Sequence, residues 1–337
     1  MIKEAIATAA AGREVPTAVM ERAMEALFTG EATPSQIGAL LVALRMKGET
    51  AGEISASARV MRRHCVPVKV SHAAVLDTCG TGGDGSLTFN ISTAASLVVA
   101  GAGVPVAKHG NRAASSKTGS ADVLEQLGVN VELPAAAVER CIEQCGIGFM
   151  FARLHHPAMR HVAATRAEIG VRTLFNFLGP LCNPASASHQ LIGVPEPRLC
   201  EMLARVLGDL DTTRSWVVCG DGNVDEIALS GPTRVAQIDR GKLEASEVTP
   251  EDFGVQRQPL ESLKVEDVGQ SAAVIRAVLA GERGPRRDVV VINAAAALFV
   301  AERVGSLREG AAMAAESIDS GAAQRKLEAW SAQSKAG

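Results

Sequence analysis

A glycine-rich stretch between an expected strand and an expected helix is the first place in this chain where chemistry is indicated. It reads Asp77-Thr-Cys-Gly-Thr-Gly-Gly-Asp-Gly-Ser-Leu-Thr-Phe-Asn-Ile-Ser-Thr93, and its four glycines allow a sharp turn and a close approach of the backbone to a ligand. We expect Asn90, Ser92 and Thr93 to cap the first turn of the following helix. Because a helix N-terminus attracts anions, the stretch predicts a phosphate site at a strand–loop–helix junction.

Two known glycine motifs begin in this stretch, and neither is completed. Gly80-x-Gly82-x-x-Gly85 matches the dinucleotide fingerprint, which requires an acidic residue about 20 positions later. Residues 86–121 contain no Asp or Glu. The phosphate-loop motif requires Lys and then Ser or Thr after its last glycine, where this chain has Ser86-Leu87. A glycine-rich surface loop without a ligand is the plain alternative, but it does not explain the basic segment after the next expected strand.

That basic segment combines cationic, small and hydroxyl side chains. It reads Lys108-His-Gly-Asn-Arg-Ala-Ala-Ser-Ser-Lys-Thr-Gly-Ser120. Backbone N–H, ammonium and hydroxyl donors in such a loop suit phosphate, whereas a solvated basic loop is the alternative. Two phosphate-suited loops at consecutive strand ends favour the phosphate interpretation, because ligands of such sheets lie beyond the carboxyl ends of the strands.

Adjacent carboxylates, Asp225 and Glu226, follow a further expected strand. Such a pair suits Mg²⁺, which often binds through one or two carboxylates plus substrate phosphates. Acidic residues that open a helix would explain the same pair, and the neighbouring phosphate loops lead us to favour the metal. Arg166 ends the helical part of an insert, where it can bind a planar carboxylate through two hydrogen bonds. An interdomain salt bridge is the alternative for Arg166.

Motifs for a nucleophile or a structural metal are missing. The chain contains no Gly-x-Ser-x-Gly, CxxC or HExxH sequence. We therefore expect no covalent catalytic residue, and a reaction that depends on positioning and charge.

Bulk composition excludes several classes of protein. The chain has 337 residues, which is enough for two domains, and a net charge of −3, which gives no general attraction to nucleic acid or an anionic membrane. No apolar run reaches the roughly 18 residues of a membrane span, and the start lacks a signal-peptide pattern. Seven cysteines without paired spacing are typical of reduced thiols. We expect a cytoplasmic protein with neither a membrane nor a nucleic-acid partner.

The pattern of elements predicts two kinds of structure. About the first 65 residues read as helices, and from residue 75 strands alternate with helices, which favours a mainly parallel sheet. We expect strands at 75–78, 104–108, 148–151, 216–219, 235–239 and 289–292, and helices at 91–101, 119–127, 135–145, 196–208, 269–280, 306–316 and 320–333. The segment 155–184 interrupts the alternation as a helical insert that returns to the N-terminal helices and leaves a cleft. The polar segment 240–268 shows no clear pattern.

Taken together, these motifs resemble those of anthranilate phosphoribosyltransferases. The resemblance rests on the glycine-rich stretch, Lys108-His-Gly-Asn-Arg112, His156-Pro-Ala-Met, Arg172-Thr-x-Phe-Asn-x-Leu-Gly-Pro-Leu-x-Asn-Pro184 and Asp225-Glu226, in this order over most of the chain. It implies transfer of the phosphoribosyl group of phosphoribosyl pyrophosphate to the amine of anthranilate in tryptophan biosynthesis. The products are N-(5′-phosphoribosyl)anthranilate and pyrophosphate. Mg²⁺ and a homodimer through the helical domains are also implied.

The resemblance implies a fold of the α/β class. This fold joins a small all-helical domain to a larger α/β domain with a mainly parallel central sheet, of the nucleoside phosphorylase/phosphoribosyltransferase type. We expect the helical domain to comprise residues 1–70 with the insert 155–184, and the α/β domain to comprise 71–154 and 185–337.

The resemblance also implies roles for individual residues of this chain. Phosphoribosyl pyrophosphate would be held by Gly80, Gly83, Asp84, Thr88, Asn90, Ile91, Ser92, Thr93, Lys108, His109, Gly110, Asn111, Arg112, Ala113, Ala114, Ser115, Ser116 and Ser120. Anthranilate would be bound by Gly80, Asn111 and Arg166, with His109 and His156 as neighbours. The metal ligands would be Ser92, Asp225 and Glu226. A pyrimidine nucleoside phosphorylase is the main alternative. A non-catalytic, nucleic-acid-binding relative is a second, and the net charge argues against it.

Overall fold

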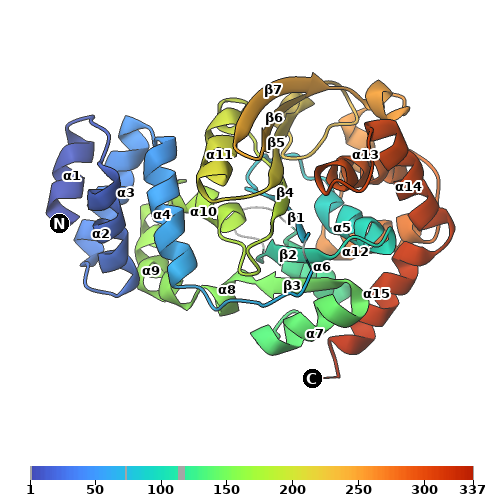
Figure 1. Cartoon of the computed structure of the whole chain (residues 1–337), viewed down its shortest axis with the longest axis horizontal. Coiled ribbons are helices and arrows are strands. Elements are labelled where there is room, and N and C mark those ends of the chain that lie inside the picture. Colours follow the sequence, from blue (N-terminus) through green and yellow to red (C-terminus); the bar gives the residue numbers. More distant parts are fainter. Residues whose placement is uncertain (1, 73, 113–117, 337) are drawn as a thin grey trace.

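The computed structural model describes residues 2–72, 74–112 and 118–336, and Figure 1 shows helices at one end and an α/β part at the other. Its helices are α1 (Ile2–Ala10), α2 (Thr17–Phe28), α3 (Pro34–Lys47), α4 (Ala51–Arg63), α5 (Ile91–Gly101), α6 (Ser120–Gln126), α7 (Ala135–Cys145), α8 (Ala152–His155), α9 (Arg160–Ile169), α10 (Phe175–Leu181), α11 (Arg198–Asp209), α12 (Val268–Leu279), α13 (Pro285–Val300), α14 (Leu307–Asp319) and α15 (Ala322–Gln333). Its strands are β1 (Leu76–Gly80), β2 (Val106–Gly110), β3 (Ile147–Phe151), β4 (His189–Gly193), β5 (Arg214–Gly220), β6 (Thr233–Asp239) and β7 (Lys242–Val248). None of the helices in the described ranges is both long and apolar enough to cross a bilayer.

The N-terminal helices begin and end where local chemistry dictates. Thr33 opens α3 and Thr50 opens α4, each within a capping box that satisfies backbone N–H groups of the first turn. The backbone N–H of Gly48 closes α3 by donating to Leu44 O. Buried leucines on one side of α3 then pack with the other helices of this part.

A seven-stranded sheet in the order β3-β2-β1-β4-β5-β6-β7 forms the centre of the α/β part. Strands β1 to β5 pair in parallel, whereas β6 and β7 pair antiparallel. The mainly parallel sheet expected from the sequence is therefore confirmed. The chain moves from β1 to β2 and β3 on one side and continues with β4 and β5 on the other, so a topological switch lies beside β1.

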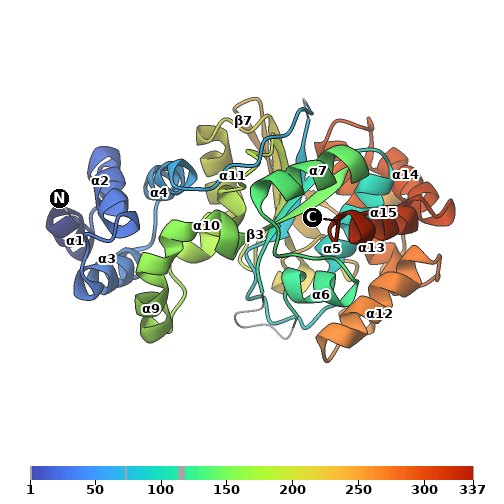
Figure 2. The ribbon, with the colours of Figure 1, turned by 90° about the horizontal axis from the view of Figure 1, so that it is seen from below.

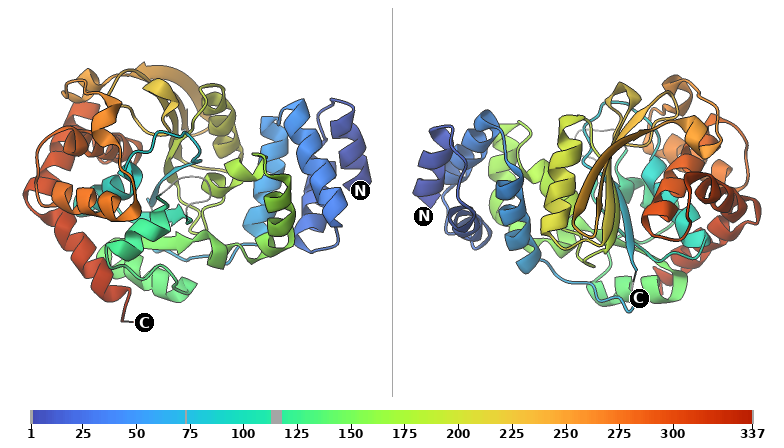
Figure 3. Two further views of the ribbon diagram at one scale, coloured as in Figure 1. Left: turned by 180° about the vertical axis from the view of Figure 1, so that it is seen from behind. Right: turned by 45° about the horizontal axis from the view of Figure 1, so that its top comes forward.

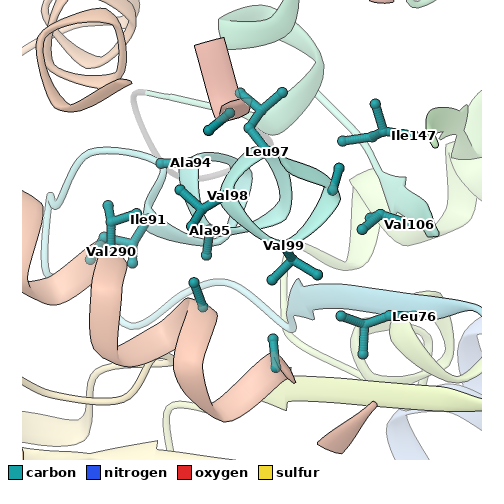
Figure 4. Packing of buried hydrophobic residues seen from close by; sticks show 14 of the residues in the cluster. Leu76, Ile91, Ala94, Ala95, Leu97, Val98, Val99, Val106, Ile147 and Val290 are labelled. Atoms are coloured by element: carbon teal, nitrogen blue, oxygen red, sulfur yellow. The ribbon is translucent and has the colours of Figure 1, made fainter. Parts of the chain in front are cut away.

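Two hydrophobic cores lie on opposite faces of this sheet. On one face α5 packs on β1, β2 and β3, and beside it α13 packs on β4 and β5. Figure 4 shows Val98 and Val99 of α5 with Leu76 of β1 and Val290 of α13 around them. On the other face α11 covers β5 and β6 and lies beside α4 (Figures 2 and 3). Its buried residues continue into the core of α1–α4. The sheet thus has helices on both faces, as parallel sheets require.

The insert connects the helical end to the sheet. Helix α9 packs against α2 and α3, and α10 packs against α4 and β2, so the insert does return to the N-terminal helices. The last carbonyl groups of α10 are each bonded by a different element: Gly179 O by His109 Nδ1 of β2, Pro180 O by Gln190 Nε2 of β4, and Leu181 O by Arg62 Nε of α4. These bonds satisfy acceptors that a helix end leaves free.

Three assignments from the sequence were wrong or incomplete. Residues 289–292, expected as a strand, lie inside α13, because a continuous apolar run suits a helix buried on all sides as well as a strand. The sequence reading missed β4, and it missed β7 within the unassigned segment 240–268, where two 3₁₀ turns also lie. The insert helix starts at Arg160, after a 3₁₀ turn at Pro157–Met159, and not at residue 155. The remaining predicted strands are present, with ends shifted by at most two residues.

Candidate active site

A polar cavity of about 330 Å³ lies at the carboxyl ends of β1 and β2. Residues of both predicted phosphate loops line it together with Asp225 and Glu226, so the structure brings these three segments together. The site residues on its wall are Gly80, Gly83, Asp84, Thr88, Asn90, Ser92, Lys108, His109, Gly110, Asn111, Arg112, Ser120, Asp225 and Glu226. The predicted residues Ala113, Ala114, Ser115 and Ser116 lie outside the described residues. Ile91 and Thr93 are buried in α5 and do not line the cavity.

The glycine loop is bonded to the carboxylate segment. Gly82 N–H donates to Asp225 Oδ2 at 2.9 Å. A Cβ atom on Gly80 would collide with the same carboxylate, and a Cβ on Gly83, which has φ of 82°, would collide with the Arg172 guanidinium. These glycines are closely approached by side chains of the protein itself, and the expected approach to a ligand stays a prediction.

The first turn of α5 is capped differently from our expectation. The prediction that Asn90, Ser92 and Thr93 cap it with their side chains was wrong: Asn90 makes no capping bond and donates instead to Thr118 O at 3.3 Å. Glu226 Oε1 accepts the Ser92 N–H at 3.0 Å. A carboxylate from a distant loop takes this place because the positive end of a helix favours a full negative charge.

Three carboxylates share one small region. Asp84 Oδ2 accepts the backbone N–H of Asp225 at 3.5 Å, while Glu226 follows directly in the chain. Loss of solvent, followed by the charge of Asp84, raises the pKa of Asp225 to about 7. Loss of solvent and the charge of Asp225 raise the pKa of Glu226 to about 8.

These carboxylates fit a divalent cation, which would relieve the repulsion between them. Within the described ranges, no three His, Cys, Asp or Glu side chains form a complete metal cluster. An ion at this site therefore needs further oxygen ligands, such as substrate phosphates. The predicted ligand Ser92 lies close by, with its Oγ 3.4 Å from Lys108 Nζ.

The two basic residues of the second loop have different surroundings. Lys108 belongs to β2, where it is buried, and its ammonium donates to Thr78 O at the base of the cavity. Arg112 forms ion pairs with Asp122 and Glu125 of α6 at 2.9 and 2.6 Å. Lys108 is therefore held by a backbone carbonyl of β1, whereas Arg112, which also lines the cavity, is held by two carboxylates of α6.

Arg166 is a further predicted site residue that does not line this cavity. Its guanidinium lies 5.0 Å from the centre of the Phe175 ring, and burial lowers its pKa. Two residues that sequence reasoning did not assign to the site, Arg172 and Asn176, reach the cavity wall from the insert. The sequence analysis could have assigned both residues to the site from their place in the Arg172-Thr-x-Phe-Asn176 motif.

Two histidines meet beside the cavity. His109 Nε2 and His156 Nε2 are 3.2 Å apart, and His109 Nδ1 is 2.9 Å from Gly179 O. Because a carbonyl only accepts, Nδ1 of His109 carries its proton, its Nε2 accepts, and His156 Nε2 donates. Burial lowers the pKa of both rings, that of His156 to about 4, so both are neutral at pH 7.

Two glycines that the sequence did not mark make room for the carboxylate segment. A Cβ on Gly193, at the end of β4, would collide with the backbone of Asp225. A Cβ on Gly220, at the end of β5, would lie 2.6 Å from Glu226 O. The sequence feature that could have revealed these two glycines is their position at the end of a strand.

Comparison with known proteins identifies the family. Residues 3–65 match the family model "Glycosyl transferase family, helical bundle domain", and residues 72–324 match "Glycosyl transferase family, a/b domain". The anthranilate phosphoribosyltransferase of Symbiobacterium thermophilum is 54% identical over 327 residues, which cover 97% of this chain and 96% of that protein.

Solved structures agree with this match. The anthranilate phosphoribosyltransferase of Thermus thermophilus has a TM-score of 0.93 and 46% identity, covering 98% of this chain and 99% of its own. That of Saccharomyces cerevisiae, in complex with phosphoribosyl pyrophosphate and Mg, has a TM-score of 0.92 and 25% identity, covering 100% and 98%. The family expected from the motifs is confirmed: this chain belongs to the anthranilate phosphoribosyltransferases.

Proposed function

We propose that this chain transfers the phosphoribosyl group of phosphoribosyl pyrophosphate to the amine of anthranilate, as a step of tryptophan biosynthesis. The observation that carries the proposal is the cavity in which two phosphate-suited loops face the Asp225–Glu226 pair. The doubly phosphorylated sugar is held by the predicted residues on the cavity wall: Gly80, Gly83, Asp84, Thr88, Asn90 and Ser92 of the first loop and Lys108, His109, Gly110, Asn111, Arg112 and Ser120 of the second. Asp225 and Glu226, with Ser92 beside them, hold Mg²⁺.

The reaction follows from charge separation at the anomeric carbon. When the bond to the diphosphate breaks, positive charge develops on the ribose and negative charge on the leaving group. The buried ammonium of Lys108, which lines the cavity and is held by Thr78 O, stabilises that negative charge without reorganising. Bound Mg²⁺ supplies further neutralisation of the diphosphate. The aromatic amine has a free lone pair at neutral pH, so it needs to be held in line rather than deprotonated.

A direct assay separates this activity from its alternative. The purified protein should consume anthranilate with phosphoribosyl pyrophosphate and Mg²⁺, which is followed by the loss of anthranilate fluorescence. The same preparation should not cleave thymidine with inorganic phosphate. Phosphorolysis of thymidine together with inert anthranilate would replace the proposal by the nucleoside phosphorylase alternative.

The carboxylate pair should matter for turnover more than for anthranilate binding. In Asp225→Asn/Glu226→Gln the shape is kept and both charges are lost, so we expect kcat at limiting Mg²⁺ to fall about 100-fold or more. Anthranilate affinity, measured by calorimetry, should change much less. Turnover that stays at the wild-type level under limiting Mg²⁺ would remove the metal role of this pair.

The space made by Gly193 should also be needed. Gly193→Ala places a methyl group against the Asp225 backbone, and a displacement of about 1 Å at a catalytic group can lower a rate about 100-fold. We expect kcat/KM to fall at least tenfold. Gly38→Ala is the matched control, because its Cβ would meet only Thr165 Cγ2 at an ordinary 3.8 Å. Equal activity of the two variants would show that the carboxylate segment tolerates the shift.

Arg166 is proposed to bind the anthranilate carboxylate. Its guanidinium has lost part of its solvent and packs on the Phe175 ring, and the described part of the chain supplies it with no ion pair. A charge-assisted bond contributes about 1.5–3 kcal/mol, so Arg166→Ala should raise KM for anthranilate about tenfold or more. KM for phosphoribosyl pyrophosphate should stay within about twofold, as in the control Arg160→Ala on the same helix. The opposite order of effects would contradict the assignment.

We further propose a cytoplasmic homodimer that associates through the helical domain, composed of residues 1–70 and 155–184. Val42 and Met46 on α3 are 36% and 84% exposed, which is unusual for apolar side chains one turn apart on a helix. Val162 and Leu178 of the insert lie in the same buried core as α1–α4, which supports grouping the insert with these helices, and this core continues into α11. Val42→Glu/Met46→Glu should sediment as a monomer, whereas Lys242→Glu, on β7, should sediment as a dimer. A dimer in both variants would place the interface elsewhere.

A further inference from the structure

The ladder between β1 and β2 stops unusually early. Leu76 pairs with Val106, and no later pair is formed between these two strands. By contrast, β1 pairs with β4 over five successive residues, and β2 pairs with β3 over five. The carboxyl ends of β1 and β2 therefore separate in front of the cavity, and the backbone groups between them need other partners.

Side chains bond three of the four backbone groups of the missing rung. The next parallel rung would pair Thr78 with Lys108 and would use the N–H and C=O of Thr78, the C=O of Ala107 and the N–H of His109. Lys108 Nζ instead donates to Thr78 O. Asn183 Nδ2 donates to Ala107 O at 2.9 Å. Asp77 Oδ1 accepts the His109 N–H at 3.1 Å.

Asp77 and Asn183 complete this arrangement by bonding to each other. Asn183 Nδ2 donates to Asp77 Oδ2 at 2.7 Å, and both residues are buried, with 0% and 1% exposure. The amide orientation is fixed, because Asn183 Oδ1 accepts the Ala185 N–H at 2.8 Å while Nδ2 faces two acceptors. Both amide hydrogens and both carboxylate oxygens are therefore used, and Asp77 Oδ2 also accepts a longer bond of 3.7 Å from Cys79 Sγ.

The pair reaches the active site only through its neighbours. Lys108 and His109 line the cavity, whereas Asp77 and Asn183 do not. Asp77 fixes the backbone of His109, directly after Lys108, and Asn183 belongs to the insert just beyond α10. The same bonds thus set how far β2 stands from β1 and how the insert sits over both strands.

We propose that Asp77 and Asn183 form a positioning pair that holds the carboxyl ends of β1 and β2 apart, so that Lys108 and His109 face the bound substrates. This inference rests on the proposed phosphoribosyl transfer. The pair contacts neither substrate. It fills the gap between the two strands, and the Asp77 carboxylate and the Asn183 amide supply the acceptors and donors that the backbone there requires. A charge or a volume alone would not supply that pattern.

Exchange of donors and acceptors tests the pair without changing its shape. Asp77→Asn places an amide donor against the amide of Asn183, and Asn183→Asp places a carboxylate against that of Asp77 and against Ala107 O. We expect each single variant to lower kcat about 10- to 100-fold, with KM for both substrates within about threefold. In Asp77→Asn/Asn183→Asp the complementarity between the two positions returns in reverse, and kcat should recover at least fivefold over the better single variant. Recovery stays partial because Ala107 O still lacks its donor.

A substitution that only destabilises the fold should lower Tm and leave kcat unchanged, and Ser317→Ala serves as this control. Ser317→Ala removes a buried hydrogen bond to Val98 O on the far side of the sheet, and it should lower Tm while leaving kcat unchanged. All variants are assayed well below their own Tm, with the folded fraction measured by circular dichroism. Should Asp77→Asn not fold, Asn183→Ser, which removes the bond to one of the two acceptors, gives the same comparison of kcat with Tm.

Two results would overturn the inference. One is wild-type kcat in the folded single variants, and the other is a double variant no more active than the worse single variant. Wild-type protein in the same assay distinguishes failure of the positioning role from failure of the proposed function. An inactive wild type refutes the phosphoribosyl transfer itself, whereas an active wild type with equally active variants refutes only the positioning role.

Discussion

Negative charge gathered at the carboxyl edge of the sheet is the constraint on which the rest of the site depends. Asp225 bonds to the N–H of the glycine loop, and Glu226 bonds to the first turn of α5, so two adjacent carboxylates hold both neighbouring segments in place. Their raised pKa values show that loss of solvent and mutual repulsion oppose this arrangement. A bound cation and the buried ammonium of Lys108 can offset the repulsion between these carboxylates. The glycines at 80 and 193 exist where this segment needs room.

The architecture places these charges where two separately packed cores meet. The core around α5 and α13 supports the glycine loop from one face, while the core shared by α11 and the N-terminal helices supports the insert from the other. The cavity receives lining residues from both sides, because Arg172 and Asn176 come from the insert. Lining residues from different elements can orient two different substrates, one phosphate-rich and one aromatic, as a transfer between them requires.

Much of this was predictable from local sequence, and the failures share one cause. The glycine loop, the basic segment and the acidic pair were found because each combines special residue types at short spacing, and the sheet edge then brought them together. The capping of α5 by Glu226 and the role of Gly193 depend on contacts between residues far apart in the chain, which no local pattern encodes. Residues 289–292 were assigned to a strand because tertiary burial, and not periodicity, decides the state of a fully apolar run.

The C-terminal end of α10 connects three elements of the protein through hydrogen bonds to its carbonyl groups. Its final acceptors are committed to β2, β4 and α4, so this short helix is tied at one point to three elements that belong to both cores. Displacement of any one of them strains the bonds to the other two. A ligand that drew His109 toward it would therefore act, through the end of α10, on the bond that Leu181 O accepts from Arg62 of α4.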